Sequence, residues 1–301
     1  MHILVNAQAI AEVAKERFAA AKAEGGLKNR EKAKIFVGYD TRFMSKEFAE
    51  TMSAVFAANG VEAVLSSVDT PTPAISWLLG ATRGEEYDLA VNITASHNPF
   101  EYDGIKVNEP FGGQAGSDIT SAIENKMGEI SAGRIKIKYE NPESGFNSGN
   151  IAIKDDLMAE YVSAYIEMFK RQFNIKNEAD FDAFKEKAKN FFFVADVKSG
   201  TTPKYYEEIM KALGIENYEI INDEFDPTFG GEDPNPDKNT AMLKERVEAV
   251  KKENPGAFVY GLATDPDGDR MAVIENGKTF TTDEIIIYNQ YRLLEKAVQR
   301  G

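Results

Sequence analysis

Two kinds of hydrophobic pattern alternate along the chain. Residues 9–24 place Ile10, Val13 and Phe18 on one face of a helix, whereas residues 34–40, KIFVGYD, form a short apolar run that ends in polar residues. The first pattern predicts an amphipathic helix and the second a buried strand. Strands that alternate with helices in this way predict an α/β protein with a mostly parallel sheet and helices on both faces.

The alternation forms two cycles of similar length. In the first cycle we expect helices over 9–24, 45–60, 72–81 and 118–130, and strands over 34–40, 61–68, 87–94, 105–107 and 133–139. In the second we expect helices over 156–173, 202–214, 240–253 and 282–301, and strands over 190–197, 218–223, 257–265 and 270–277. Residues 140–155, ENPESGFNSGNIAIKD, are rich in Asn, Ser and Gly, which is typical of a linker. The sequence thus predicts two tandem three-layer α/β/α domains with mixed, mostly parallel sheets, over residues 1–150 and 151–301.

Charge and composition narrow the classes of function. The formal net charge is -14, so the chain has no general attraction for nucleic acid or for an anionic membrane surface. It contains no cysteine, which excludes disulfides and thiolate zinc sites and is consistent with a reducing compartment. The N-terminal stretch does not have the pattern of a signal peptide, and no apolar run is long enough to span a bilayer. These features predict a cytoplasmic protein without a nucleic acid or membrane partner.

A crowded polar loop follows the strand predicted over 87–94. The stretch NITASHNPFEYDGIKV brings Ser96, His97, Asn98 and Lys106 within a few positions of one another. In parallel sheets, ligands bind beyond the carboxyl ends of the strands, where this loop lies. Ser96 is a candidate nucleophile, and His97 and Lys106 are candidates to assist it. The alternative is a connecting loop in which Ser96 and Asn98 cap a turn.

A second loop, in YGLATDPDGDRMAV, carries three aspartates at alternate positions. Asp265, Asp267 and Asp269 repel one another unless a cation lies between them. An EF-hand calcium loop would need Gly at the sixth position and Glu at the twelfth, where this chain has Arg270 and Asn276. Mg²⁺ uses few protein carboxylates and completes its shell with phosphate or water. The sequence favours a metal site here, and a solvated acidic turn is the alternative.

The two loops complement each other chemically. A phosphoryl group on Ser96 would supply an oxygen ligand to a metal held by the aspartates, and the metal would offset its negative charge. This combination makes Ser96 a candidate phosphoryl carrier and places part of its metal site in the second domain.

Several motifs resemble those of the α-D-phosphohexomutases, in particular the phosphoglucomutase/phosphomannomutase group. TASHNP followed by DGIKV is similar to the active-serine loop of that family, and DPDGDR to its metal loop. GYDTR at 38–42, PTPAI at 71–75 and FDPTFGGEDPNPD at 225–237 resemble further segments in the expected order. The resemblance covers nearly the whole chain.

The resemblance implies an enzyme that interconverts hexose 1-phosphates and 6-phosphates, with phosphoserine, Mg²⁺ and a bisphosphorylated sugar intermediate. A hexose 1,6-bisphosphate would act as activator, and hexose phosphates would be the partners. The metal ligands would be Ser96, through its phosphate, together with Asp265, Asp267 and Asp269. The residues around the transferring phosphoryl group would be Arg42, His97, Asn98, Lys106 and Arg270, with Lys106 as acid/base. Arg42 and Arg270 have an alternative role as ordinary ion-pair partners of a neighbouring aspartate.

The chain also departs from the family pattern. Members usually begin with a strand and a turn of the form FGTxGxRG, which does not precede residues 1–10, and they contain third and fourth domains. The resemblance therefore implies domains I and II only, with domains III and IV absent. We expect this chain alone to be a weak or inactive mutase that still binds Mg²⁺ and holds phosphoserine. The motifs do not distinguish glucose from mannose and indicate no oligomeric state.

Two other classes of function remain open on the sequence. DPDGD after a strand is similar to the start of the aspartate-nucleophile phosphatases, although Asp269 occupies a position that is normally Thr or Val there. The chain could also be a non-catalytic module that binds Mg²⁺ or a phosphosugar. A Ser96→Ala variant that retains full phosphoryl transfer would exclude the mutase, whereas loss only in Asp265→Asn would favour the phosphatase.

Overall fold

The computed structural model describes residues 2–26, 30–82 and 85–299. The chain divides into two compact units by contacts: unit 1 comprises residues 1–95 and 103–161, and unit 2 comprises residues 96–102 and 162–301. The Ser96 loop therefore belongs by its contacts to unit 2, although the strand before it belongs to unit 1. Among the described helices, none has both the length and the hydropathy that crossing a membrane requires.

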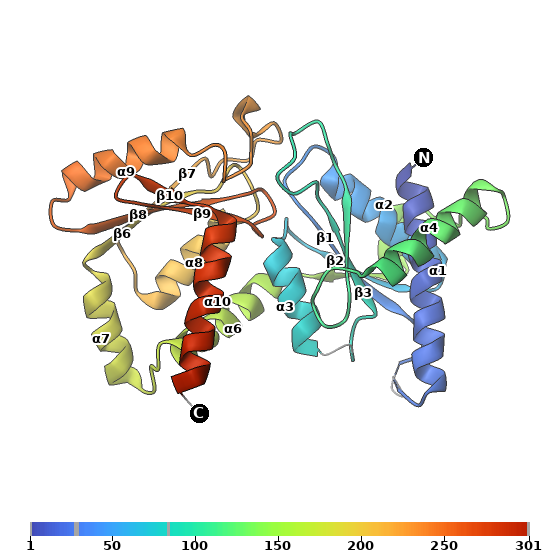
Figure 1. Ribbon diagram of the computed structural model, residues 1–301. Coiled ribbons are helices and arrows are strands. Elements are labelled where there is room, and N and C mark those ends of the chain that lie inside the picture. Colours follow the sequence, from blue (N-terminus) through green and yellow to red (C-terminus); the bar gives the residue numbers. More distant parts are fainter. Residues whose placement is uncertain (1, 27–29, 83–84, 300–301) are drawn as a thin grey trace. The chain divides into compact units, whose positions relative to one another are not determined.

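Unit 1 contains a five-stranded sheet of order β4-β3-β1-β2-β5, of which Figure 1 labels β1, β2 and β3. Its strands are β1 (Lys34–Tyr39), β2 (Glu62–Ser66), β3 (Leu89–Ile93), β4 (Ile105–Asn108) and β5 (Ile151–Lys154). Four of them are parallel, and only β4 runs antiparallel, against β3. Tyr39 pairs with Ile93, so β1 and β3 end at the same edge of the sheet. Asp40 and Thr94, the residues that directly follow these two strands, consequently meet there.

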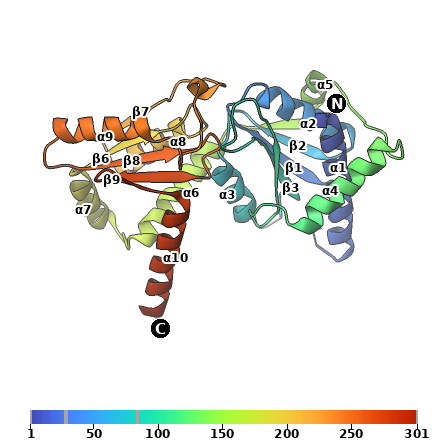
Figure 2. The ribbon, with the colours of Figure 1, turned by 45° about the horizontal axis from the view of Figure 1, so that its top comes forward.

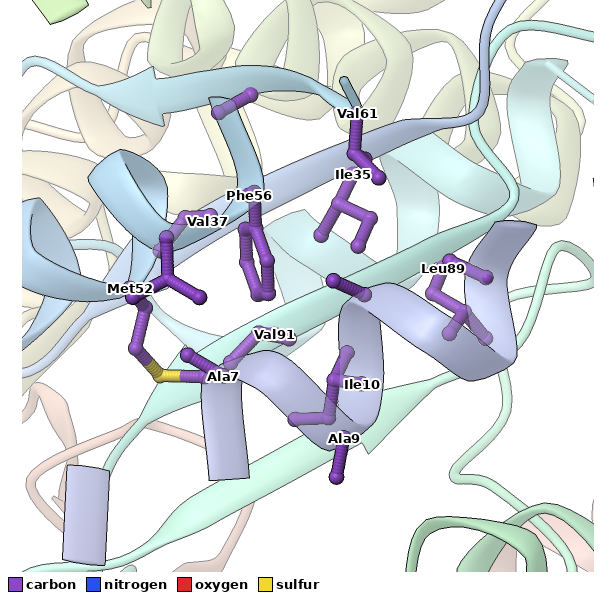
Figure 3. Packing of buried hydrophobic residues seen from close by; sticks show 14 of the residues in the cluster. Ala7, Ala9, Ile10, Ile35, Val37, Met52, Phe56, Val61, Leu89 and Val91 are labelled. Carbon is purple, nitrogen blue, oxygen red and sulfur yellow. The ribbon is translucent and has the colours of Figure 1, made fainter. Parts of the chain in front are cut away.

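Helices cover both faces of this sheet, which explains why its central strands are continuous apolar runs. The helices of unit 1 are α1 (His2–Ala23), α2 (Ser45–Ala58), α3 (Thr72–Thr82), α4 (Ser117–Ser131) and α5 (Pro142–Asn147). Both ribbon views show α3 on the opposite side of the sheet from α1 and α4 (Figures 1 and 2). Ile10, Met52 and Phe56 pack against Ile35 and Val91 on one face, as Figure 3 shows. Successive side chains of a strand point to opposite faces, so Phe36 packs instead with the α3 cluster.

Unit 2 has a second five-stranded sheet, of order β10-β9-β8-β6-β7. Its strands are β6 (Phe191–Asp196), β7 (Tyr218–Ile221), β8 (Phe258–Thr264), β9 (Met271–Glu275) and β10 (Lys278–Phe280). Strands β7, β6 and β8 are parallel, and β9 returns antiparallel to β8 through the aspartate loop. Asp196 pairs with Ala263, so the loops after β6 and β8 leave the same edge of this sheet.

Unit 2 is also covered on both faces. Its helices are α7 (Glu178–Ala188), α8 (Pro203–Leu213), α9 (Ala241–Glu253) and α10 (Thr282–Gln299), and α6 (Leu157–Gln172) contains the division between the units. Leu243 and Val247 of α9 pack on Val194 and Val259. Figure 1 shows α8 on the other side of the sheet from α9. The α/β class with two three-layer units and mostly parallel sheets is thus confirmed.

Two local predictions are wrong. The stretch predicted as a linker contains α5, whose first turn is capped by Asn141, and β5, which pairs with β2. The strand predicted over 133–139 is absent, because β5 occupies the sheet edge beside β2 and the backbone N–H of Lys138 donates to the Gln8 side chain instead. We expected the two domains to divide at residue 150, and the two units defined by contacts divide between Tyr161 and Val162. Helix α7 and strand β10 were not predicted.

Candidate active site

The aspartate loop links β8 to β9 in a tight turn. Asp265 and Asp267 are completely buried, whereas Asp269 is exposed, and one carboxylate oxygen from each lies within 4.8 Å of the others. Gly268 has a φ of +69°, a left-handed conformation that residues with a side chain rarely adopt. The turn is closed by backbone N–H donation from Gly268 to the Asp265 carbonyl and from Arg270 to Asp265 Oδ1. Alternate spacing on this turn makes the three side chains converge.

Convergence of buried carboxylates has an electrostatic cost. Burial, together with the negative charges of the neighbouring Asp267 and Asp269, raises the pKa of Asp265 to about 8. A divalent cation would remove this repulsion, and the cluster offers only oxygen ligands, as Mg²⁺ and other hard cations require. The three aspartates therefore fit the metal that the resemblance implies.

Ser96 contacts this cluster directly. Its Oγ donates a hydrogen bond of 3.1 Å to Asp265 Oδ2, and its side chain is nearly buried. Its φ is +56°, in the left-handed region that non-glycine residues rarely adopt. Such strained residues cluster at functional sites, where the surrounding structure maintains them. A strained, buried serine hydroxyl against a carboxylate cluster is consistent with a reactive group.

His97 lies beside Ser96 and faces positive charge. Its Nδ1 is 3.4 Å from Ser96 Oγ. Burial lowers the pKa of His97 below its usual value, Arg270 and Lys238 lower it further, and two acidic neighbours oppose them. The net shift favours the neutral form of the imidazole. Lys238 was not a predicted site residue, although it directly follows the segment FDPTFGGEDPNPD that supported the resemblance.

Arg42 is deeply buried in unit 1. Its Nε donates a 3.0 Å hydrogen bond to Asp40 Oδ2, and both side chains are almost inaccessible to solvent. Ser45 Oγ also donates to Asp40, at 2.9 Å from Oδ1, and lies 3.2 Å from an oxygen of Asp103. Burial raises the pKa of Asp40 to about 6, although Arg42 and Thr94 lower it. Arg42 thus forms the ion pair that was its alternative role.

The other predicted residues divide between the units. Asn98 is exposed in the Ser96 loop. Lys106 is half-buried in β4, opposite Asn92 of β3. The structure brings Ser96, His97, Arg270 and the aspartates together within unit 2, whereas Arg42 and Lys106 belong to unit 1.

The fold defines the chain as a protein of two α/β/α units, and comparison with known proteins identifies the family. Residues 4–134 match the family model of phosphoglucomutase/phosphomannomutase α/β/α domain I, and residues 163–278 match that of domain II. The chain belongs to this family, the α-D-phosphohexomutases.

Individual relatives are distant and longer. A phosphoglucomutase from Komagataeibacter xylinus is 31% identical over 252 residues, covering 80% of this chain and 42% of the relative. A phosphoglucosamine mutase from Alkaliphilus oremlandii is 29% identical over 262 residues, covering 86% and 50%. The crystal structure of a Paramecium phosphoglucomutase, parafusin, superimposes with a TM-score of 0.65 at 22% identity, covering 92% and 50%. The chain therefore spans about half the length of the curated relatives it matches.

Proposed function

We propose that this chain carries the phosphoserine and the metal site of a phosphohexomutase, which interconverts hexose 1-phosphates and 6-phosphates through a bisphosphorylated sugar. The observation that carries the proposal is the 3.1 Å hydrogen bond from Ser96 Oγ to Asp265 Oδ2. It joins the candidate phosphoryl carrier to the carboxylate cluster that fits a divalent cation. A loop that only connects two strands does not require a serine hydroxyl bonded to a cluster of buried carboxylates.

The reaction consists of two transfers of opposite direction. Phosphorylated Ser96 gives its phosphoryl group to the free hydroxyl of a hexose monophosphate. The new P–O bond to the sugar forms, the sugar hydroxyl proton passes to a base, the Ser96 Oγ–P bond breaks and Ser96 Oγ takes up a proton. The bisphosphate then returns its other phosphoryl group to Ser96: Ser96 Oγ gives up its proton as it bonds to phosphorus, and the leaving sugar oxygen takes up a proton. Mg²⁺ held by Asp265, Asp267 and Asp269 would neutralise negative charge on the phosphoryl oxygens.

The remaining site residues act through charge and hydrogen bonding. Arg270, close enough to His97 to lower its pKa, offers positive charge to the phosphoryl oxygens, where charge spreads in the transition state. A neutral His97 can hold the Ser96 oxygen by a hydrogen bond, and the exposed Asn98 is proposed as a substrate contact. Lys106 is proposed as acid/base and Arg42 as a further phosphate contact. A hexose 1,6-bisphosphate would prime Ser96, and the absence of cysteine is consistent with work in the cytoplasm.

The first experiment asks whether Ser96 accepts a phosphoryl group. The wild-type chain is incubated with glucose 1,6-bisphosphate and Mg²⁺, and intact mass and peptide mapping follow. We expect one added phosphoryl group on the Ser96 peptide and none in Ser96→Ala. Ser53→Ala is the matched control, because it removes another buried serine hydroxyl, bonded to the Ala49 carbonyl in α2. A phosphoryl group found on Asp265 or Asp267 would instead support an aspartate-nucleophile phosphatase.

The second experiment measures turnover. A coupled assay follows glucose 6-phosphate formed from glucose 1-phosphate with the bisphosphate as primer. Turnover that depends on Ser96 supports the mutase, while phosphorylation of Ser96 without turnover favours a module that holds phosphate and metal but does not catalyse. Turnover retained in full by Ser96→Ala contradicts the proposal.

A further inference from the structure

The aspartate loop is held from outside by the loop that follows β6. The carbonyl oxygen of Pro266 accepts two hydrogen bonds, and both come from Thr201: one from its backbone N–H at 2.8 Å and one from its hydroxyl at 3.0 Å. Pro266 lies between the two buried aspartates in the sequence. A group that fixes its carbonyl therefore fixes the chain between Asp265 and Asp267.

The contact between the two loops is very close. A Cβ atom at Gly200 would lie 2.6 Å from both the Cα and the carbonyl oxygen of Pro266, closer than real Cβ contacts. Only glycine permits this approach without moving the aspartate loop. Two residues after Gly200, the Thr202 hydroxyl lies 3.0 Å from the hydroxyl of Thr264, the residue before Asp265.

The loop that follows β6, residues 197–202, is held in place by its own contacts. Lys198 and Ser199 both have left-handed backbones, with φ of +50° and +51°. The ammonium group of Lys198 is buried against Asp196 Oδ2 at 2.6 Å and donates to the Asn239 carbonyl at 2.8 Å. The backbone N–H of Ser199 donates to the Asn222 carbonyl at 2.7 Å. Strained backbone of this kind persists only where its surroundings over-determine it.

We propose that Thr201 is a positioning residue for the metal centre, and that its hydroxyl and N–H on the Pro266 carbonyl set the separation of the Asp265 and Asp267 carboxylates. This inference rests on the metal site of the proposed function. Groups that orient ligands without touching the metal commonly change metal affinity by 10–100-fold when removed. Both hydrogen bonds from Thr201 end on the Pro266 carbonyl, so its effect on the aspartates would act through the backbone.

The test compares three variants by their affinity for Mn²⁺, used as a probe for Mg²⁺ and measured by titration calorimetry on the full chain. Thr201→Val keeps the shape and the backbone N–H but loses the hydroxyl, and we expect affinity to fall on the order of tenfold. Thr201→Ser restores the hydroxyl and should return to near the wild-type value. Thr70→Val is the matched control, since it removes another fully buried threonine hydroxyl that donates to a carbonyl, of Val68 in unit 1. It should leave the affinity unchanged.

A spectroscopic readout separates positioning from simple destabilisation. The Mn²⁺ EPR spectrum should broaden or shift in Thr201→Val and not in Thr70→Val, even if both melt at lower temperature. If Thr201→Val does not fold, Gly200→Ala is used in its place, because its added methyl group displaces Pro266 directly. Wild-type Mn²⁺ affinity and spectrum in folded Thr201→Val or Gly200→Ala would overturn the inference alone. A wild-type chain that does not bind Mn²⁺ would overturn the metal site and the inference together.

Discussion

Ser96 Oγ donates to Asp265 Oδ2 at 3.1 Å, so a candidate phosphoryl carrier is hydrogen-bonded to a candidate metal ligand. Phosphorylation would replace that donor with a group of about -1.5 to -2 charge. The contact would then become repulsive unless a cation lies between the two residues. Phosphorylation and metal binding should consequently be coupled.

The coupling can be measured on one protein preparation. We expect the form phosphorylated on Ser96 to bind Mn²⁺ about tenfold more tightly than the same protein after phosphatase treatment, within the usual range of coupling between sites. Titration calorimetry of both forms gives the ratio. Equal affinities would mean that the phosphate does not contribute to the metal site.

Replacing Asp265 should have opposite effects on the stability of unit 2 without metal and on its stabilisation by Mg²⁺. Asp265→Asn removes one of three converging carboxylates, so we expect unit 2 to become more stable without metal at pH 8 and to lose its stabilisation by Mg²⁺. Hydrogen exchange of β8 and β9 peptides, with and without Mg²⁺, reports both effects. Asp223→Asn, an exposed aspartate of the same unit, should change neither. A variant that Mg²⁺ still protects would show that Asp265 is not a ligand.

The raised pKa of Asp265 predicts a pH dependence with a definite sign. In the unfolded chain an aspartate ionises near pH 4, whereas the folded, metal-free protein keeps the Asp265 proton up to a pKa of about 8. Between these values the folded state binds more protons, so the free energy of unfolding falls as pH rises. The stabilisation is complete below pH 4 and lost above pH 8.

The same hydrogen exchange experiment, repeated from pH 5 to pH 9 with rates corrected for intrinsic exchange, checks this sign. Protection of β8 should decrease over that range without metal, and Asp265→Asn should flatten the profile. Protection that increases with pH would contradict it.

The sequence predicted the parts of the fold that depend on local pattern. Helix α9 and strand β1 show clear periodicity or a clear apolar run, and both formed within a few residues of the expected bounds. The strand expected around Ile135 and Ile137 failed for a non-local reason: both side chains do pack half-buried against the core, but β5 takes the sheet edge. The hydrophobic pattern predicts which side chains are buried. It does not predict which segment pairs with the edge strand of the sheet.

The candidate site shows the same limit. The aspartates and Ser96 were found because charge repulsion and a motif mark them in the sequence. No motif or charge pattern in the sequence points to Lys238 or Thr201. Lys238 acts through its charge on His97, and Thr201 acts through the backbone of Pro266. Roles that depend on proximity in space rather than on residue type need the structure.

Lys238 yields a prediction about His97. Because burial, Arg270 and Lys238 together lower the pKa of His97, Lys238→Gln should raise it. NMR titration of the ring resonances measures the change, and a His2→Gln background leaves His97 as the only histidine. Lys252→Gln, which removes an exposed lysine of the same unit, is the control. An unchanged titration in Lys238→Gln would show that Lys238 is not near the imidazole in solution.

Arg42 and Asp40 form a buried pair whose disruption should depend on pH. Arg42→Met leaves the Asp40 carboxyl buried without its guanidinium partner, and loss of one member of such a pair costs about 3–5 kcal/mol. Since the pKa of Asp40 is about 6 even with Arg42 present, the carboxyl is mostly ionised at pH 7 and mostly neutral at pH 5. The loss of stability should therefore be large at pH 7 and clearly smaller at pH 5.

Urea unfolding followed by the fluorescence of Trp77, the only tryptophan of the chain, reports on unit 1. Arg17→Met, which breaks a half-exposed pair with Glu109 in the same unit, should cost little at either pH. If Arg42→Met were as stable as wild type at pH 7, the ion pair with Asp40 would not stabilise unit 1. That result would contradict the structural role of Arg42 and strengthen its proposed role in binding phosphate.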